Sequence, residues 1–176
     1  MNLTSKTIAI GVTACSPASK TIDLVRDLRK KGADVHIIMT PNSVHFVSPI
    51  LLQRESGNPL QIEQFELPKS YDPNYRSISA KADLIVVAPA SANTIGKIAN
   101  GIADNLLTTT ILSSKAPVLI AMHINPVMFA KASVQRNIRQ LKEDGFLFSE
   151  NPDGQRPSMF PSIELISKDV DVFFAE

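Results

Sequence analysis

The chain has 176 residues, and its hydrophobic fraction of 44% is enough for one domain with a sizeable core over residues 1–176. Its 18 basic and 17 acidic residues leave a net charge of +1 without a basic block, which argues against nucleic acid or a membrane surface as a partner. With one cysteine, no long apolar run and no secretory pattern, the expected location is cytoplasmic.

The first half of the chain alternates apolar runs with helix-start signals. Residues 7–12 (TIAIGV) and 34–39 (DVHIIM) are rich in β-branched side chains, which is typical of buried parallel strands. Each is followed by a hydroxyl residue and a proline, Ser16-Pro17 and Thr40-Pro41, a pair that favours the first turn of a helix. We expect helices over 16–31, through Ser43, Phe46 and Val47, and over 50–56, and then an irregular segment over 57–79.

The second half repeats this alternation. Residues 83–88 (DLIVVA) and 117–122 (PVLIAM) have the pattern of buried strands, and Asn125-Pro126 is a third start of the cap-plus-proline kind. Gly101 is expected to separate two helices, and Asp104-Asn105 either to cap the second of them or to line an interface. We expect helices over 94–100, 104–112, 125–145 and 162–174, a short strand over 146–148 and an irregular segment over 151–161.

Strands that alternate with helices predict an α/β fold. The expected architecture is a doubly wound parallel sheet, Rossmann-like or flavodoxin-like, with about five to six strands in three layers. The carboxyl ends of all strands then meet at one edge, where Ser16, Thr40, Ser91 and Asn125 would gather. Free N–H groups at four helix starts favour an anion such as a phosphate.

Motifs that the sequence lacks restrict the classes of ligand expected at this edge. Neither G-x-G-x-x-G nor G-x-x-x-x-G-K-[ST] is present, which argues against a dinucleotide and against an NTP. His36, His45 and His123 are scattered, so no metal site is expected. A ligand with one phosphate remains, of which FMN is the commonest, although the same caps could merely begin helices.

The stretch PASANTIGKIANGIADNLLTT, residues 89–109, closely resembles the PASANT motif of the homo-oligomeric flavin-containing cysteine decarboxylases. That family includes phosphopantothenoylcysteine decarboxylases and lantibiotic-modifying enzymes. Its second motif, P-x-M-N-x-x-M-[WY], is matched in part by residues 122–129, which keep Asn125 and Met128. Its G-S-I-[AS]-A-Y-K turn corresponds to residues 14–20, with Ala14 in place of the glycine.

This resemblance implies FMN bound between the subunits of a homotrimer or of a homododecamer built from trimers. The phosphate would lie on the turn at Cys15 and Ser16 and on Thr40, with the backbone of residues 90–93 beside the isoalloxazine ring. Cys15 at a helix start could have a lowered thiol pKa or could simply pack there. The cofactor-binding residues implied are Ala14, Cys15, Ser16, Thr40, Ser43, Phe46, Pro89, Ala90, Ser91, Ala92, Asn93 and Met122.

The implied substrate is a peptide or small molecule with a terminal or conjugated cysteine. Flavin would oxidise the cysteine thiol to a thioaldehyde, after which CO2 leaves and an ene-thiol forms. Asn125 would hold the substrate carboxylate. The family's catalytic histidine aligns with Tyr75, whose phenol, with a reference pKa of about 10, is a poor base. Tyr75 could be a substitute acid or only a loop aromatic at a subunit contact. His123 could serve instead, or could be only a hydrogen-bonded neighbour.

Residues 149–154 (SENPDG) lack the clamp cysteine that phosphopantothenoylcysteine decarboxylases use for a later reduction, so a reaction here would stop at the ene-thiol. Three readings stay open. The first is an FMN-dependent cysteine decarboxylase. The second is an FMN-binding member without that activity, either a flavin reductase, an electron-transfer protein or a regulatory pseudo-subunit, and the third is a protein that has lost FMN.

Overall fold

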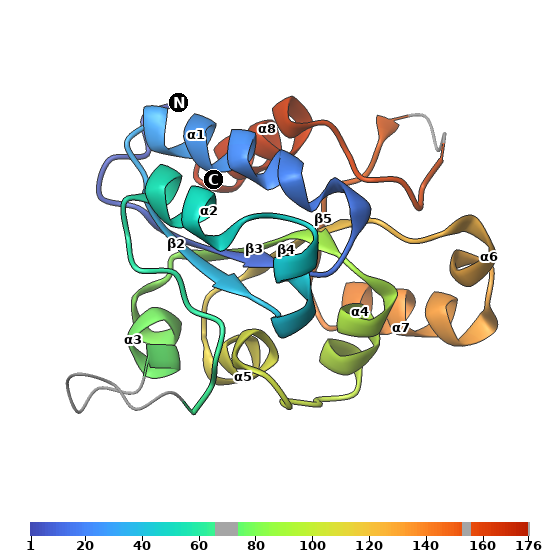
Figure 1. The fold of residues 1–176 in the computed structure, drawn as a ribbon. Helices are drawn as coiled ribbons and strands as arrows, with labels where there is room; N and C mark the ends of the chain where they lie inside the picture. The colour runs from blue at the N-terminus through green and yellow to red at the C-terminus, as the bar shows by residue number, and fades with distance from the viewer. Residues whose placement is uncertain (66–73, 153–155, 176) are drawn as a thin grey trace.

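The centre of the molecule is a sheet of five parallel strands in the order β2-β1-β3-β4-β5 (Figure 1). The computed structural model describes residues 1–65, 74–152 and 156–175. The strand order reverses between β1 and β3, and such a switch point is where open α/β sheets bind ligands. The strands are β1 (Thr7–Val12), β2 (Asp34–Met39), β3 (Leu84–Ala90), β4 (Val118–Met122) and β5 (Leu147–Phe148).

Helices cover both faces of the sheet, which confirms the doubly wound fold. Helices α1, α2 and α8 lie on one face, and α3, α4, α5 and α7 lie on the other (Figure 1). In the described ranges, no helix is both long and apolar enough to cross a membrane. The helices are η1 (Ser16–Lys20), α1 (Thr21–Lys30), η2 (Pro41–His45), α2 (Pro49–Ser56), α3 (Asn74–Lys81), α4 (Ala92–Ala99), α5 (Leu106–Ser113), α6 (Pro126–Phe129), α7 (Ala132–Glu143) and α8 (Ile163–Phe173), where η marks a 3₁₀ helix.

Side chains of the central strands alternate between two hydrophobic layers. On β1, Ile8 and Ile10 pack with Leu24 of α1 and Ile166 of α8. Ala9 points to the opposite layer, which contains α4, α5 and α7. Since successive side chains of a strand point to opposite faces, a fully apolar strand can serve both layers at once. This explains why the strands contain continuous apolar runs.

Two predicted elements are wrong in part. The segment expected to be irregular contains helix α3 over Asn74–Lys81, which buries Ile78 against the α5 side of the sheet. The helix expected over 16–31 begins as the 3₁₀ helix η1 and becomes α-helical only at Thr21. A run of prolines before α3 obscured its short apolar pattern, and a 3₁₀ turn is a common way for a helix to begin.

The single helix expected over 125–145 is also wrong, because the chain breaks between α6 and α7. Lys131 is extended (φ −68°, ψ 133°) and occupies the N-cap position of α7. The side-chain amide of Gln135 donates to the carbonyl of Phe129 at 2.7 Å, which satisfies an acceptor at the end of α6. No glycine or proline marks this break in the sequence.

Close packing at Gly11 generates a stability prediction. A Cβ at Gly11 would lie 2.5 Å from a methyl carbon of the buried Leu107, whereas a Cβ at Gly96 would meet only Asn137 at 3.3 Å. We expect Gly11→Val to lower the free energy of unfolding by about 1–3 kcal/mol through overpacking. Gly96→Ala, within a helix, should raise it by up to about 1 kcal/mol.

Urea denaturation of both variants tests this comparison. Valine favours strands, so a loss of stability in Gly11→Val would come from the contact with Leu107. The prediction is wrong if Gly11→Val is as stable as the wild-type protein.

Candidate functional site

A cavity of about 730 Å³ opens at the carboxyl edge of the sheet, where the ends of β1, β3 and β4 meet. It brings together most of the side chains that the sequence pattern assigned to one edge. Among the residues that the structure describes, no Asp, Glu, Lys or Arg side chain lines it, so the cavity presents neutral polar groups, the imidazole of His123 and apolar surface. The lining residues are Ala14, Cys15, Ser16, Asn42, Ser91, Ala92, Asn93, His123, Ile124, Asn125, Pro126, Met128 and Met159.

A smaller cavity of about 270 Å³ adjoins it and shares Ala14, Asn42, Ser91 and Asn93 with it. Thr40, at the end of β2, lines this second space. Its charged side chains, Lys97 and Asp104, form an ion pair of 2.7 Å, so they neutralise each other. The two cavities together form a continuous site along the ends of β2, β1, β3 and β4.

Thr13 joins the two loops that frame this site. Its buried hydroxyl donates to the carbonyl of Pro89 at 2.8 Å and accepts the backbone N–H of Ser91 at 3.0 Å. The backbone N–H of Thr13 also donates to Pro89 at 3.3 Å. One side chain therefore fixes the loop after β1 against the loop after β3, directly at the switch point.

Helix α4 supplies backbone donors to the site. Ser91 is its N-cap and accepts the N–H of Thr94 at 3.2 Å, as the sequence predicts. The first bond of the helical ladder runs from Ile95 to Ser91, so the amides of Ala92 and Asn93 precede it. Such amides have no partner within a helix and are suited to an anion or a ligand carbonyl.

Two of the other predicted helix starts, Ser16 and Thr40, differ from expectation, whereas Asn125 caps α6 as predicted. Ser16 does not cap η1; Cys15 has the N-cap position, without a side-chain cap bond. Thr40 occupies the N-cap position of η2 but makes no side-chain cap bond there. Its hydroxyl instead donates to the carbonyl of Val12 at 3.4 Å. Because η1, η2 and α6 are short, the site depends on individual donors more than on the dipoles of long helices.

His123 lines the larger cavity. Its Nδ1 accepts the backbone N–H of Phe160 at 3.3 Å, and its Nε2 lies 3.1 Å from the hydroxyl of Ser16. Burial, together with the charge of Lys20, lowers the pKa of His123 below its ordinary value. Both effects favour the neutral form of the imidazole.

Cys15 packs at the turn and is not an activated nucleophile. Its thiol is buried and lies 3.7 Å from the carbonyl of His123 and 3.5 Å from the Thr13 hydroxyl. Burial raises the pKa of Cys15, although the hydrogen bond with Thr13 acts in the opposite direction. Of the two expectations for this residue, packing agrees with the structure.

Asn125 presents a fixed amide at the mouth of the cavity. Its Oδ1 accepts the backbone N–H of Val127 at 2.9 Å, which caps α6. Within the part of the chain that the structure describes, the side-chain N–H groups of Asn125 have no hydrogen-bond partner, so they can donate to a ligand.

Several predicted residues support the site from behind the cavity walls. Ser43 is buried and donates to the carbonyl of Thr40 at 2.6 Å. Ala90 accepts the backbone N–H of His123 at 2.9 Å. Tyr75 belongs to α3, and its side chain lies outside the described residues. The predicted residues that line neither cavity are Ser43, Phe46, Pro89, Ala90 and Met122.

Sequence reasoning missed Thr13, Asn42 and Met159. Asn42 directly follows the Thr40-Pro41 signal, so its position after a strand could have suggested it. Thr13 ends the first strand run, but its partners lie 76 and 78 residues away. Met159 lies in the segment before α8, and no local pattern links it to the sheet edge.

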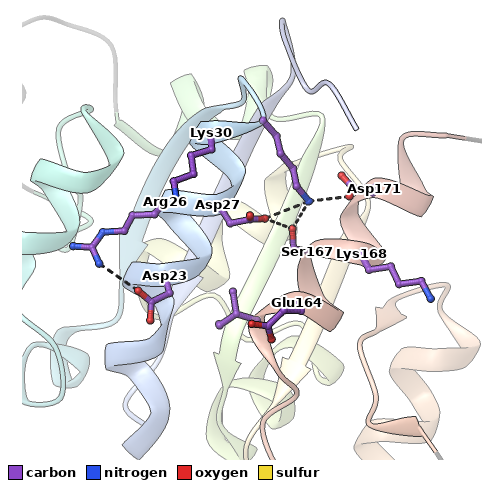
Figure 2. Close-up of a pocket in the computed structure, with 10 residues that line it drawn as sticks. Asp23, Arg26, Asp27, Lys30, Glu164, Ser167, Lys168 and Asp171 are labelled. Atoms are coloured by element: carbon purple, nitrogen blue, oxygen red, sulfur yellow. Dashed lines mark hydrogen bonds and ion pairs between the residues drawn. The ribbon is translucent and has the colours of Figure 1, made fainter.

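A third cavity, of about 510 Å³, lies between α1 and α8 on one face of the sheet (Figure 2). Asp27, Ser167 and Asp171 belong to one network of hydrogen bonds and ion pairs, marked by dashed lines in Figure 2. Lys31 contacts Asp27 at 3.2 Å and Asp171 at 2.8 Å. Burial opposes ionisation of Asp27, but bonds from Ser167 and Lys31 outweigh it and lower the pKa of Asp27. This network ties two helices together.

Known proteins resemble the chain along almost its whole length. A family model described as Flavoprotein matches residues 1–171. The coenzyme A biosynthesis bifunctional protein CoaBC of Bacillus subtilis (strain 168) is 39% identical over 152 residues, 86% of this chain and 37% of that protein. CoaBC of Haemophilus influenzae is 35% identical over 145 residues, covering 82% of this chain and 36% of that protein. The chain spans little more than a third of the length of these curated relatives.

Solved structures agree with this assignment. The crystal structure of the FMN-dependent cysteine decarboxylase SpaF has a TM-score of 0.85, with 28% identity and 99% of both chains covered. The peptidyl-cysteine decarboxylase EpiD has a TM-score of 0.78 and 30% identity, covering 96% of this chain and 98% of that one. The expected family is confirmed.

The Thr13 bridge generates a second prediction. Thr13→Val keeps the shape but leaves the buried Pro89 carbonyl and Ser91 amide without this partner, so the free energy of unfolding should fall by about 1–3 kcal/mol. Thr13→Ser keeps the hydroxyl and loses one methyl, at a cost of about 1 kcal/mol or less. Urea denaturation of both variants measures the difference. A serine variant as unstable as the valine variant would contradict the proposed role of the hydroxyl.

The lowered pKa of His123 predicts a pH dependence. Because folding favours the neutral imidazole, its stabilising contribution is present above the unfolded pKa of about 6.5 and is lost as the pH falls through the lower folded pKa. The wild-type protein should therefore lose more stability than His123→Gln between about pH 7.5 and about pH 5. Denaturation of both proteins at these pH values measures this, and parallel curves would show that the prediction is wrong.

Proposed function

The chain belongs to the flavoprotein family, and from that premise we propose that it binds FMN at the sheet edge and decarboxylates a terminal or conjugated cysteine. The observation that carries this proposal is the cavity of about 730 Å³ that Asn125 lines together with Ser91, Ala92 and Asn93 of the PASANT segment. FMN, when bound, supplies a two-electron acceptor for the substrate thiol.

The donor set of the site fits FMN. A phosphate needs several N–H and O–H donors, which the Ser16 hydroxyl and the free amides of Ala92 and Asn93 can supply. Thr40 and Ser91 line the same two cavities, but their hydroxyls already bond within the protein. Of the described residues, no carboxylate lines the larger cavity, and the Asp104 carboxylate of the smaller one is paired with Lys97. Apolar surface from Met128 and Met159 suits a flat aromatic ring.

Asn125 is suited to holding the substrate carboxylate. Its oxygen is occupied by the Val127 amide, so its side-chain N–H groups remain to donate to a carboxylate oxygen. An amide holds the carboxylate without giving it a proton, which keeps the group in the ionised form that can leave as CO2. The neutral lining around Asn125 would neither repel nor protonate it.

The product would be released at the ene-thiol stage. A later reduction needs a second reactive thiol, and Cys15 is the only cysteine of the chain. Its thiol is buried, and burial raises its pKa, so it stays protonated and unreactive.

A second function is favoured by a specific observation in the sequence. No histidine occurs between His45 and His123, so the family's catalytic base is missing from the segment around Tyr75. An FMN-binding member without decarboxylase activity, such as a flavin reductase, an electron-transfer protein or a regulatory pseudo-subunit, would not need that base. Rapid oxidation of NAD(P)H by the FMN-loaded protein, without CO2 release, would favour this function.

Assembly into homotrimers, alone or grouped into a homododecamer, is part of the proposal. Val127 and Met128 are 68% and 51% exposed beside the cavity, and Phe46 is 47% exposed after η2. Large apolar side chains gathered near an open site are typical of surfaces that another subunit covers. Sedimentation analysis with and without FMN measures the oligomeric state, and a monomer in both conditions would contradict this part.

The activity is tested with the FMN-loaded protein and two substrates, a peptide that ends in cysteine and phosphopantothenoylcysteine. We expect one of them to lose the mass of CO2. Asn125→Asp keeps an N-cap oxygen but places a negative charge against the substrate carboxylate, so kcat/KM should fall by about tenfold to a hundredfold. FMN affinity should change by less than about twofold, because the cofactor phosphate is held elsewhere.

Asn137→Asp is the matched control, since it makes the same charge change on α7, outside the cavity. Its kcat/KM should stay close to that of the wild-type protein. An FMN-loaded wild-type protein that releases CO2 from neither substrate would contradict the decarboxylase proposal while leaving FMN binding intact.

A further inference from the structure

We propose that His123 is a positioning residue that turns the Ser16 hydroxyl into a dedicated hydrogen-bond donor for the FMN phosphate. This inference rests on the proposed FMN function of the site. His123 lies at a position that the family motif leaves variable, so the motif itself assigns it no role. Three observations carry the proposal: the contacts of the two ring nitrogens, the remaining hydrogen of Ser16, and the place of both residues in one cavity.

The contacts of its two ring nitrogens determine the tautomer of His123. A backbone N–H can only donate, so the contact of Phe160 with Nδ1 at 3.3 Å requires a lone pair on that nitrogen. The hydrogen of the neutral ring is therefore on Nε2. Burial lowers the pKa of His123 and favours this neutral form. At neutral pH the ring thus has one assigned donor, which is directed at Ser16.

The Ser16 hydroxyl accepts from His123 and keeps its own hydrogen for a ligand. Nε2–H donates to its oxygen at 3.1 Å, and a hydroxyl that accepts in this way still has its own hydrogen to give. Among the hydrogen bonds of the described residues, none uses that hydrogen. Ser16 is exposed at the cavity, so its O–H can point to a ligand there. A phosphate oxygen only accepts, which matches this polarity.

Hydrogen bonds within the protein hold both His123 and the Ser16 hydroxyl in place. The chain of donors runs from the Phe160 amide through the imidazole to Ser16, and it joins the segment before α8 to the turn after β1. His123 is itself held by its backbone N–H, which donates to Ala90 at 2.9 Å. A donor that is oriented before binding loses less freedom when the phosphate arrives. The same ring is unsuited to act as a base at Nε2, because that nitrogen already carries the proton.

The test uses flavin fluorescence titration of the full chain with FMN and with riboflavin, which lacks the phosphate. His123→Asn can still accept the Phe160 amide but does not reach Ser16, whereas the longer side chain of His123→Gln can donate to Ser16. We expect His123→Asn and Ser16→Ala each to weaken FMN binding by about threefold to tenfold, and His123→Gln to stay within about twofold of the wild-type protein. Riboflavin affinity should change by less than about twofold in every variant.

The double variant His123→Asn with Ser16→Ala separates positioning from general support of the fold. If His123 acts through Ser16, the double variant binds FMN as weakly as Ser16→Ala alone. Additive losses, equal losses for FMN and riboflavin, or failure of His123→Gln to restore binding would each overturn the proposal. Thermal denaturation of the variants identifies a loss that comes from unfolding.

A direct readout of the tautomer complements the binding data. Nitrogen-15 NMR of the His123 ring at about pH 7.5, above its ordinary pKa, should show the proton on Nε2. A proton on Nδ1 would overturn the inference. A wild-type protein that binds FMN while all the variants bind it equally well overturns this inference alone, whereas a wild-type protein that binds no FMN overturns the proposed function as well.

Discussion

The hydroxyl of Thr13 is the interaction on which the site depends. In a parallel sheet whose order reverses between β1 and β3, the loops after these strands diverge to opposite faces, and a crevice opens between them. Thr13 spans this point by donating to Pro89 and accepting from Ser91. The crevice keeps its shape because both of its walls bind the same buried side chain. The start of α4, which supplies the free amides, is thereby fixed against the turn that contains Ser16.

The site that results recognises a ligand through neutral donors. Within residues 1–65, 74–152 and 156–175, no Asp, Glu, Lys or Arg lines its larger cavity, and the nearby Lys97 is paired with Asp104. An anion would therefore be bound by amides and hydroxyls, whose positions matter more than their charge. In such a site each donor must be oriented, since a hydroxyl that can rotate freely has to be ordered on binding. The hydrogen bonds of Thr13, His123 and Asn125 provide that order within the protein itself.

The sequence predicts the sheet well because every strand shows its own local pattern. The apolar runs, the Ser91 cap and the Asn105 cap depend on neighbouring residues, and all are found as expected. The break between α6 and α7 was not predictable in this way, because it depends on Gln135 bonding to Phe129 and on an extended Lys131. For the site, proximity to strand ends identified Ser16, Ser91 and Asn125. The bond between Ser16 and His123 joins residues 107 positions apart, and no local pattern encodes it.

The distribution of roles among the histidines bears on the choice between the two proposed functions. A cysteine decarboxylase of this family places its base in the segment that contains Tyr75, and His123 is held as a neutral donor. If His123 positions Ser16, it cannot also remove a proton through Nε2, so the protein would need another base or the substrate's own groups. A reductase or an electron-transfer protein has no such need. Because the contacts that orient Ser16 for FMN also keep His123 from acting as a base, decarboxylation would have to be supported by Asn125 and by groups of the substrate.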